Sequence, residues 1–123
     1  MLRKLFCRFK LMRVVGDSMS PTFDSGELVV VDESAFNTDE PRRGELVAAR
    51  PVRLGGKAIV KRVTGLPKER VECCRGVWQL GRDECFVVGD CEDNSLDSRR
   101  LGPLKCRELL GRVCLQLWPP KIL

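Results

Sequence analysis

Short runs of apolar, often β-branched residues recur along the chain, and stretches rich in Gly, Pro, Asp and Asn separate them. Runs of this composition and punctuation are typical of β-strands. The strands that the pattern predicts lie at residues 9–15, 27–32, 45–50, 58–63, 70–74, 76–80, 85–90 and 111–118. The connections are too short for the helical crossovers that parallel strands need, so we expect mostly antiparallel sheets.

Helical periodicity is weak throughout, and only two short helical turns are expected. "SPTF" could open one, with Ser20 as N-cap and Pro21 at the first helical position. "GPLKCRELLG" could hold the other, closed by Gly111. With 123 residues and neither an internal repeat nor a linker, the chain is predicted to be a single all-β domain, 1–123.

The composition is that of a folded globular protein, with 43% hydrophobic and 32% charged residues. The net charge of +5 is spread over mixed charges, which favours a solvated basic face and gives no support to a nucleic-acid partner. No stretch approaches the roughly 18 apolar residues of a membrane span. We therefore expect a cytoplasmic or peripherally membrane-associated protein without a transmembrane anchor, whose apolar tail "LQLWPPKIL" could touch a membrane.

Histidine is absent, and the seven cysteines include no Cys-x-x-Cys pair. A zinc site would need four scattered thiolates, so neither a metal nor another cofactor is expected. An odd number of cysteines leaves at least one unpaired, and most of them read as reduced core residues in a reducing compartment.

Ser18, in "GDSMSPTF", is either a turn residue or a nucleophile. A serine hydroxyl attacks only when a base removes its proton, and the absence of histidine excludes the Ser-His-Asp and Cys-His arrangements. A carboxylate or a lysine must then act. A lysine can do so only if burial lowers its pKa from about 10.4 by roughly two to three units.

Lys61, in "KAIVKRVTG", is the best-placed lysine. Strand alternation puts it on one face with Ile59 and Val63, while Arg62 takes the other face. The pattern does not decide which of these two basic residues meets solvent. Lys61 is the candidate base because arginine cannot give up its proton, but a lysine at a strand edge with its amine in water fits the pattern as well.

The third notable stretch, "FVVGDCEDNSLDSRRLGP", is a strand followed by a loop dense in hydrogen-bonding side chains. It fails as a calcium loop that starts at Asp90, because the sixth position is Ser95 rather than Gly and the twelfth is Leu101 rather than Glu. Another interpretation remains open, in which the stretch is a turn whose Asp and Asn side chains hydrogen-bond to the backbone of the turn itself.

Together the three stretches resemble the type I signal peptidase family of Ser-Lys serine proteases, in that family's order. "GDSMSPTF" resembles its nucleophile box, "VKRVTGLPKERVE" its lysine box and "GDCEDNSLDSR" its C-terminal box. The resemblance implies a catalytic domain of coiled antiparallel sheets that removes a presequence from a precursor protein, cleaving after small residues. It implies Ser18 as nucleophile, Lys61 as general base, Ser95 as a hydrogen-bonding partner of the lysine amine, and Asp97 with Arg99 as a supporting ion pair.

Further implied roles and departures concern the surroundings of Ser18. Met19 and Pro21 would shape the floor of the site. Some family members carry a serine where this chain has Gly16, so a second oxyanion donor must come from elsewhere. Lys68 replaces a turn glycine, and Cys91 replaces an asparagine.

The family's usual N-terminal anchor is not found, and the chain is similar in size to small anchorless members described as maturation proteases for nickel-type superoxide dismutase.

Two other interpretations remain. The self-cleaving SOS-repressor proteases share a similar "GDSM" and "VKR" core, but only 17 residues precede Ser18 and "GDCEDNSLDSR" is not a motif of theirs. A non-catalytic basic β-domain that binds a partner or an anionic surface is the other interpretation, and it stays open if Lys61 faces water. The position of the Lys61 amine, within hydrogen-bond reach of Ser18 or not, discriminates a catalytic from a non-catalytic domain.

Overall fold

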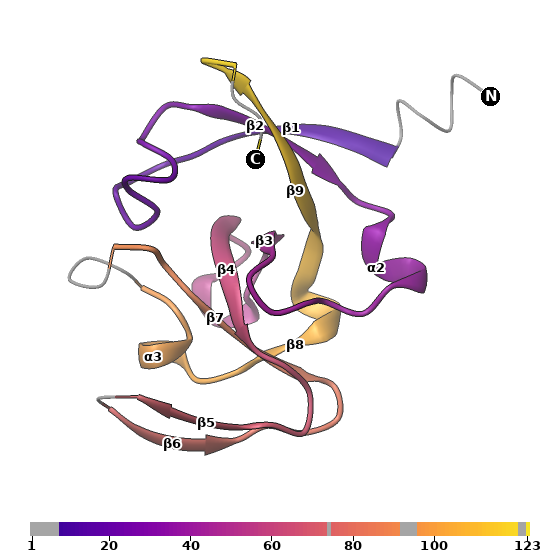
Figure 1. Cartoon of the computed structure of the whole chain (residues 1–123), viewed down its shortest axis with the longest axis vertical. Helices are drawn as coiled ribbons and strands as arrows, with labels where there is room; N and C mark the ends of the chain where they lie inside the picture. The colour runs from indigo at the N-terminus through magenta and orange to yellow at the C-terminus, as the bar shows by residue number, and fades with distance from the viewer. Residues whose placement is uncertain (1–7, 74, 92–95, 121–122) are drawn as a thin grey trace.

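A computed structural model describes residues 8–73, 75–91, 96–120 and 123. Its main feature is a curled antiparallel sheet of seven strands in the order β1-β2-β9-β3-β4-β7-β8 (Figure 1). These strands are β1 (Phe9–Arg13), β2 (Leu28–Asp32), β3 (Leu46–Ala49), β4 (Ile59–Gly65), β7 (Glu84–Val88), β8 (Leu104–Lys105) and β9 (Leu109–Trp118). A separate hairpin pairs β5 (Arg70–Cys73) with β6 (Gly76–Gln79).

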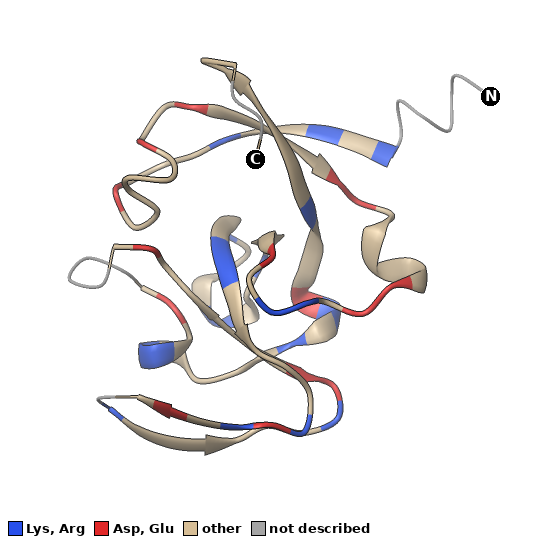
Figure 2. Ribbon diagram, in the orientation of Figure 1, with Lys and Arg blue, Asp and Glu red and all other residues tan. Residues whose placement is uncertain are grey.

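The all-β prediction is confirmed, and a strand is present in each predicted range. The helical elements are single turns: α2 (Ala35–Thr38), α3 (Ser98–Leu101), and the 3-10 turns η1 (Val52–Leu54) and η2 (Cys106–Glu108). Charged residues concentrate in the turns, but β4 carries a basic segment in the middle of the sheet (Figure 2).

Two apolar clusters form the core, and β3 contributes to both. Ala48 packs with one cluster, which includes Val60 of β4 and the loop residue Phe23. Val47 packs with the other cluster, which includes Val63 of β4. Because neighbouring residues of a strand point to opposite faces, β3 and β4 are enclosed on both sides. Such a strand gives a polar side chain little access to water.

Of the two helical turns expected from the sequence, the second is present as η2, but its closure by Gly111 and the first turn need correction. Residues 18–22 form a hydrogen-bonded turn and no helix, so Ser20 is not a helix N-cap. The segment 102–111 holds β8 and the 3-10 turn η2, and Gly111 lies inside β9 instead of closing a helix. A Cβ at Gly111 would collide with the carbonyl of Asp32 on β2. The glycine therefore permits a close strand approach, which sequence reasoning mistook for a helix end.

Candidate active site

Ser18 lies in the loop between β1 and β2, and buried side chains anchor this loop. Met19 and Phe23 are 1% and 0% exposed, and the Phe23 N–H donates to the Met19 carbonyl over 2.9 Å. Before the serine, Gly16 has a φ of +86°, which favours glycine, and its N–H donates to Ser25 Oγ over 3.0 Å. The backbone is thus held on both sides of Ser18.

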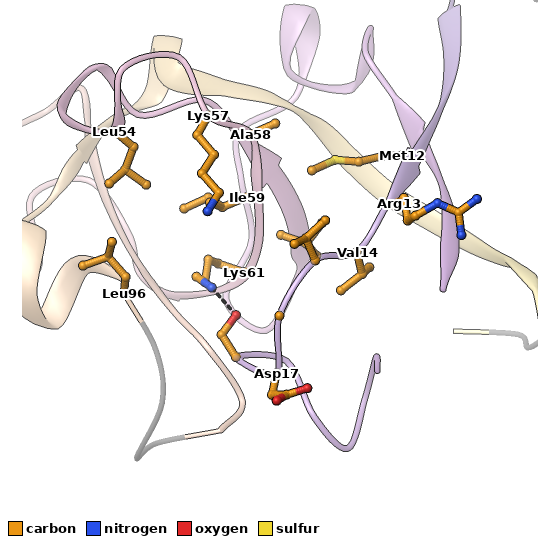
Figure 3. A pocket seen from close by; sticks show the side chains of 14 residues that line it. Met12, Arg13, Val14, Asp17, Leu54, Lys57, Ala58, Ile59, Lys61 and Leu96 are labelled. Atoms are coloured by element: carbon orange, nitrogen blue, oxygen red, sulfur yellow. Dashed lines mark hydrogen bonds between the residues drawn. The ribbon is translucent and has the colours of Figure 1, made fainter. Parts of the chain in front are cut away.

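Lys61 lies in the middle of β4, and its side chain is 3% exposed. Its amine Nζ lies 2.5 Å from Ser18 Oγ (Figure 3). The structure thus decides what the strand pattern left open: Lys61 is the buried basic residue, and Arg62 on the opposite face is half-buried. The geometry brings together the two residues singled out as nucleophile and base.

The surroundings of Lys61 favour its neutral form. Burial is the largest influence and lowers its pKa below the ordinary lysine value. The carboxylate of Asp97 opposes this shift, while the positive charges of Arg99 and Lys57 reinforce it. More of the amine is therefore neutral near pH 7 than in an exposed lysine, and only a neutral amine can accept a proton from serine.

Asp97 and Arg99 form an ion pair at the start of α3, next to this lysine. Asp97 is fully buried, and its Oδ2 lies 2.7 Å from Arg99 Nη2. The same carboxylate accepts from the Gly89 N–H over 2.7 Å and caps α3 by accepting from the Arg99 N–H over 3.0 Å. Next to it, Ser98 Oγ accepts from the Val87 N–H over 3.0 Å. The carboxylate is held firmly between β7 and α3, and sequence reasoning had assigned Ser98 no role.

A second polar network ties the Ser18 loop to β4, and sequence reasoning did not find it. Arg62 donates to both carboxylate oxygens of Asp90, over 3.0 and 2.9 Å, and Thr22 Oγ1 donates to Asp90 Oδ2 over 2.5 Å. Next to this carboxylate, the Cys91 N–H donates to the Ser18 carbonyl over 2.9 Å. The sequence did contain one signal for this network, which is the position of Arg62 directly beside the candidate lysine.

A cavity of about 280 Å³ opens beside the Ser18–Lys61 pair (Figure 3). It is lined by residues 12–18 on one side and 57–61 on the other, together with Leu54 and Leu96. Gly16 is part of this lining. Met19 and Pro21 are not: Met19 is buried in the core beneath the loop, and Pro21 is exposed. The described side chains therefore leave room beside the serine hydroxyl for part of a substrate.

Ser95 lies outside the described residues, so its expected hydrogen bond to the lysine amine stays a prediction. Within the described ranges, no group of three or more His, Cys, Asp or Glu side chains is placed to hold a metal ion. No helix there is long and apolar enough to cross a bilayer.

Comparison with known proteins points to one family. The family model described as signal peptidase, peptidase S26, matches residues 2–80 and 73–118. Mitochondrial inner membrane protease subunit 1 of Xenopus tropicalis is 31% identical over 111 residues, which cover 85% of this chain and 66% of that protein. The probable signal peptidase I-2 of Synechocystis is 28% identical over 134 residues, covering 86% of this chain and 62% of that protein. The chain thus spans somewhat less than two thirds of the length of these two relatives.

Proposed function

Because the chain belongs to the signal peptidase family, peptidase S26, we propose that it is a serine endopeptidase with a Ser18–Lys61 dyad. In this proposal it removes an N-terminal presequence from a precursor protein in trans and cleaves after small residues. The observation that carries the proposal is the 2.5 Å approach of a buried lysine amine to a serine hydroxyl. A non-catalytic β-domain would gain nothing from burying that amine, which costs free energy in its charged form.

In the first half of the reaction, the neutral Lys61 amine takes the Ser18 proton while Oγ attacks the scissile carbonyl carbon. The carbonyl oxygen becomes an oxyanion, which the Ser18 backbone N–H stabilises by donating a hydrogen bond. The Lys61 ammonium then gives its proton to the leaving amine nitrogen, and the C–N bond breaks. An ester joins the presequence to Ser18, and Lys61 is neutral again.

In the second half, Lys61 takes a proton from a water molecule, whose oxygen attacks the ester carbonyl. Collapse of this second tetrahedral intermediate breaks the C–O bond, and the ammonium returns its proton to Ser18 Oγ. The presequence leaves as a carboxylic acid, which loses its proton to water. One lysine serves as base and acid in both halves, which requires a pKa low enough for the neutral form to be populated.

The deciding experiment mixes the purified chain with candidate precursors and identifies the new N-terminus by mass spectrometry. We expect one new terminus, preceded by a small residue, and no cleavage by Ser18→Ala. Self-processing, as in the SOS-repressor proteases, would instead shorten the chain itself in the absence of substrate. An unchanged precursor with every substrate class tried, and an unchanged chain, would contradict the peptidase function.

The precursor is the finer part of the proposal. One substrate to test is a precursor of nickel-type superoxide dismutase, because the three motifs resemble the family to which the maturation proteases of that enzyme belong. A secretory presequence is the comparison substrate, since the relatives include proteins described as signal peptidase I. Parallel kcat/KM measurements on the two precursors rank them directly.

We also propose peripheral membrane contact through the face formed by β1, β2 and β9. Leu11, Val30 and Leu115 occupy one cross-strand row there, and Leu11 and Leu115 are 62% and 40% exposed. Trp118 at the end of β9 is also exposed. Sedimentation with vesicles containing anionic lipid tests this, and Leu11→Ser combined with Leu115→Ser should reduce the bound fraction.

A further inference from the structure

Lys57 stands out among the charged residues around the cavity. It immediately precedes Ala58 and β4, four residues before Lys61, and it lines the same cavity as the dyad. Its side chain reaches into the cavity beside Ile59, toward the Ser18–Lys61 pair (Figure 3). Its positive charge is also among the influences that lower the Lys61 pKa, so the two amines are electrostatically close.

Apart from the dyad, the other charged residues of the cavity wall are Arg13 and Asp17, and neither places its charge where Lys57 does. Arg13 Nη1 donates to the Gly26 carbonyl over 2.6 Å, and its guanidinium points away from the dyad (Figure 3). Asp17 lies at the opposite end of the cavity from Lys57 (Figure 3). Among the described residues, no ion pair or side-chain hydrogen bond involves Lys57. A positive charge is therefore available at one end of the cavity.

The backbone beside Lys57 can guide an extended peptide past this charge. Residues 59–62 pair with β3, but pairing with β7 begins only at Arg62. Within the described ranges, the β7-facing edge of residues 58–61 thus lacks a strand neighbour, and such an edge can accept an extended peptide. Four residues of strand span about 13 Å, so Lys57 lies about two to four residues along such a peptide from the bond at Ser18.

We propose that Lys57 is a specificity-determining residue that binds an Asp or Glu side chain of the substrate, about two to four residues from the cleaved bond. This inference rests on the proposed peptidase function, but its test measures peptide binding and does not require cleavage. The preference adds to the requirement for a small residue at the cleaved bond, because the charged pair forms at the other end of the cavity.

The test uses a peptide series with one Ala as the expected residue before the cleaved bond, and with Glu or Gln placed singly at each of the four positions before and after this Ala. At one position the Glu peptide should bind about two- to fivefold more tightly, as expected for a partly exposed ion pair. Binding is measured on Ser18→Ala, which keeps the peptide intact, so that the result does not depend on cleavage. High salt should remove the preference because it screens exposed charges.

Matched variants in the Ser18→Ala background identify the charge responsible. Lys57→Met should abolish the preference, Lys57→Arg should keep it, and Lys57→Glu should invert it in favour of a Lys peptide. Lys10→Met is the control, because Lys10 is exposed on β1 and does not line the cavity.

Equal binding of all Glu and Gln peptides, a preference that survives Lys57→Met, or no peptide binding at all would overturn the inference. Failure of the proposed function looks different: peptides bind with the Glu preference, yet the unmodified chain never cleaves them.

Discussion

Two polar networks flank the Ser18–Lys61 pair, and they differ in burial and in origin. The Asp97–Arg99 pair joins residues two positions apart around a fully buried carboxylate. The network of Arg62, Asp90 and Thr22 joins three distant segments, and the Arg62 side chain is 33% exposed.

This difference indicates that the two networks affect the Ser18–Lys61 pair in different ways. The buried carboxylate of Asp97 has the strongest electrostatic effect of any charge on Lys61. The less buried network of Asp90 should act mainly by position, since it fastens the Ser18 loop to β4 through Thr22. Breaking the first should change the pH dependence of catalysis most, and breaking the second should change the placement of the serine.

The largest effect is expected at the dyad that both networks serve. Ser18→Ala and Lys61→Ala should each lower kcat/KM by more than about a thousandfold, because the proposed nucleophile and base would act as one unit. Circular dichroism should show a retained fold, and Lys10→Ala on the exposed face of β1 is the matched control. Substantial cleavage by Lys61→Ala would remove the proposed base and the mechanism with it.

Asp97→Asn should have the next largest effect. Removing the charge of a buried ion pair should lower the free energy of unfolding by about 2–4 kcal/mol, measured by urea denaturation. Asp97 raises the pKa of Lys61, so its loss should lower that pKa further. In the proposed mechanism the neutral amine is the active form, so kcat/KM should rise with pH through this pKa, and the rise should move to lower pH in the variant. A shift to higher pH would contradict the assigned role.

Asp90→Asn should act more weakly on the same profile, because Asp90 has a smaller influence on Lys61 and its ion pair is less buried than that of Asp97. We expect a loss of about 1 kcal/mol in stability and a several-fold lower kcat. Thr22→Val should reproduce the fall in kcat without the pH shift, since it removes a loop contact but no charge. Equal pH shifts in Asp90→Asn and Asp97→Asn would erase the distinction between the networks.

The smallest effect is expected at a third carboxylate, Asp32 at the end of β2, which serves as a comparison for both networks. Hydrogen bonds from Arg8 lower the pKa of Asp32 to about 2. A lowered pKa stabilises the fold above the ordinary Asp value, and this contribution is lost as the pH falls toward 2.

Asp32→Asn should therefore unfold about 1 kcal/mol more easily at pH 7 but nearly as the parent does near pH 2, because Arg8 is half-exposed and the pair is partly screened. Urea denaturation at both pH values measures this, and kcat/KM should stay unchanged. A stability loss equal at both pH values would mean that packing, and not charge, explains the effect.

The amino-acid sequence by itself determined the fold class and narrowed the chemistry. Strand alternation and turn residues are local properties, so every predicted strand could be located without knowing its neighbours. The absence of histidine is a fact of composition, and it left lysine or a carboxylate as the base for Ser18. Three motifs in one order then predicted the family to which the chain belongs.

Only the tertiary structure decided which basic residue of β4 is buried, because alternation assigns Lys61 and Arg62 to opposite faces without saying which face is enclosed. It also paired Arg62 with Asp90, 28 positions away, and made Gly111 a point of strand contact instead of a helix end. These outcomes depend on which segments meet across the curled sheet. Burial, and with it the lowered pKa of Lys61, is a property of that packing and not of any local stretch of sequence.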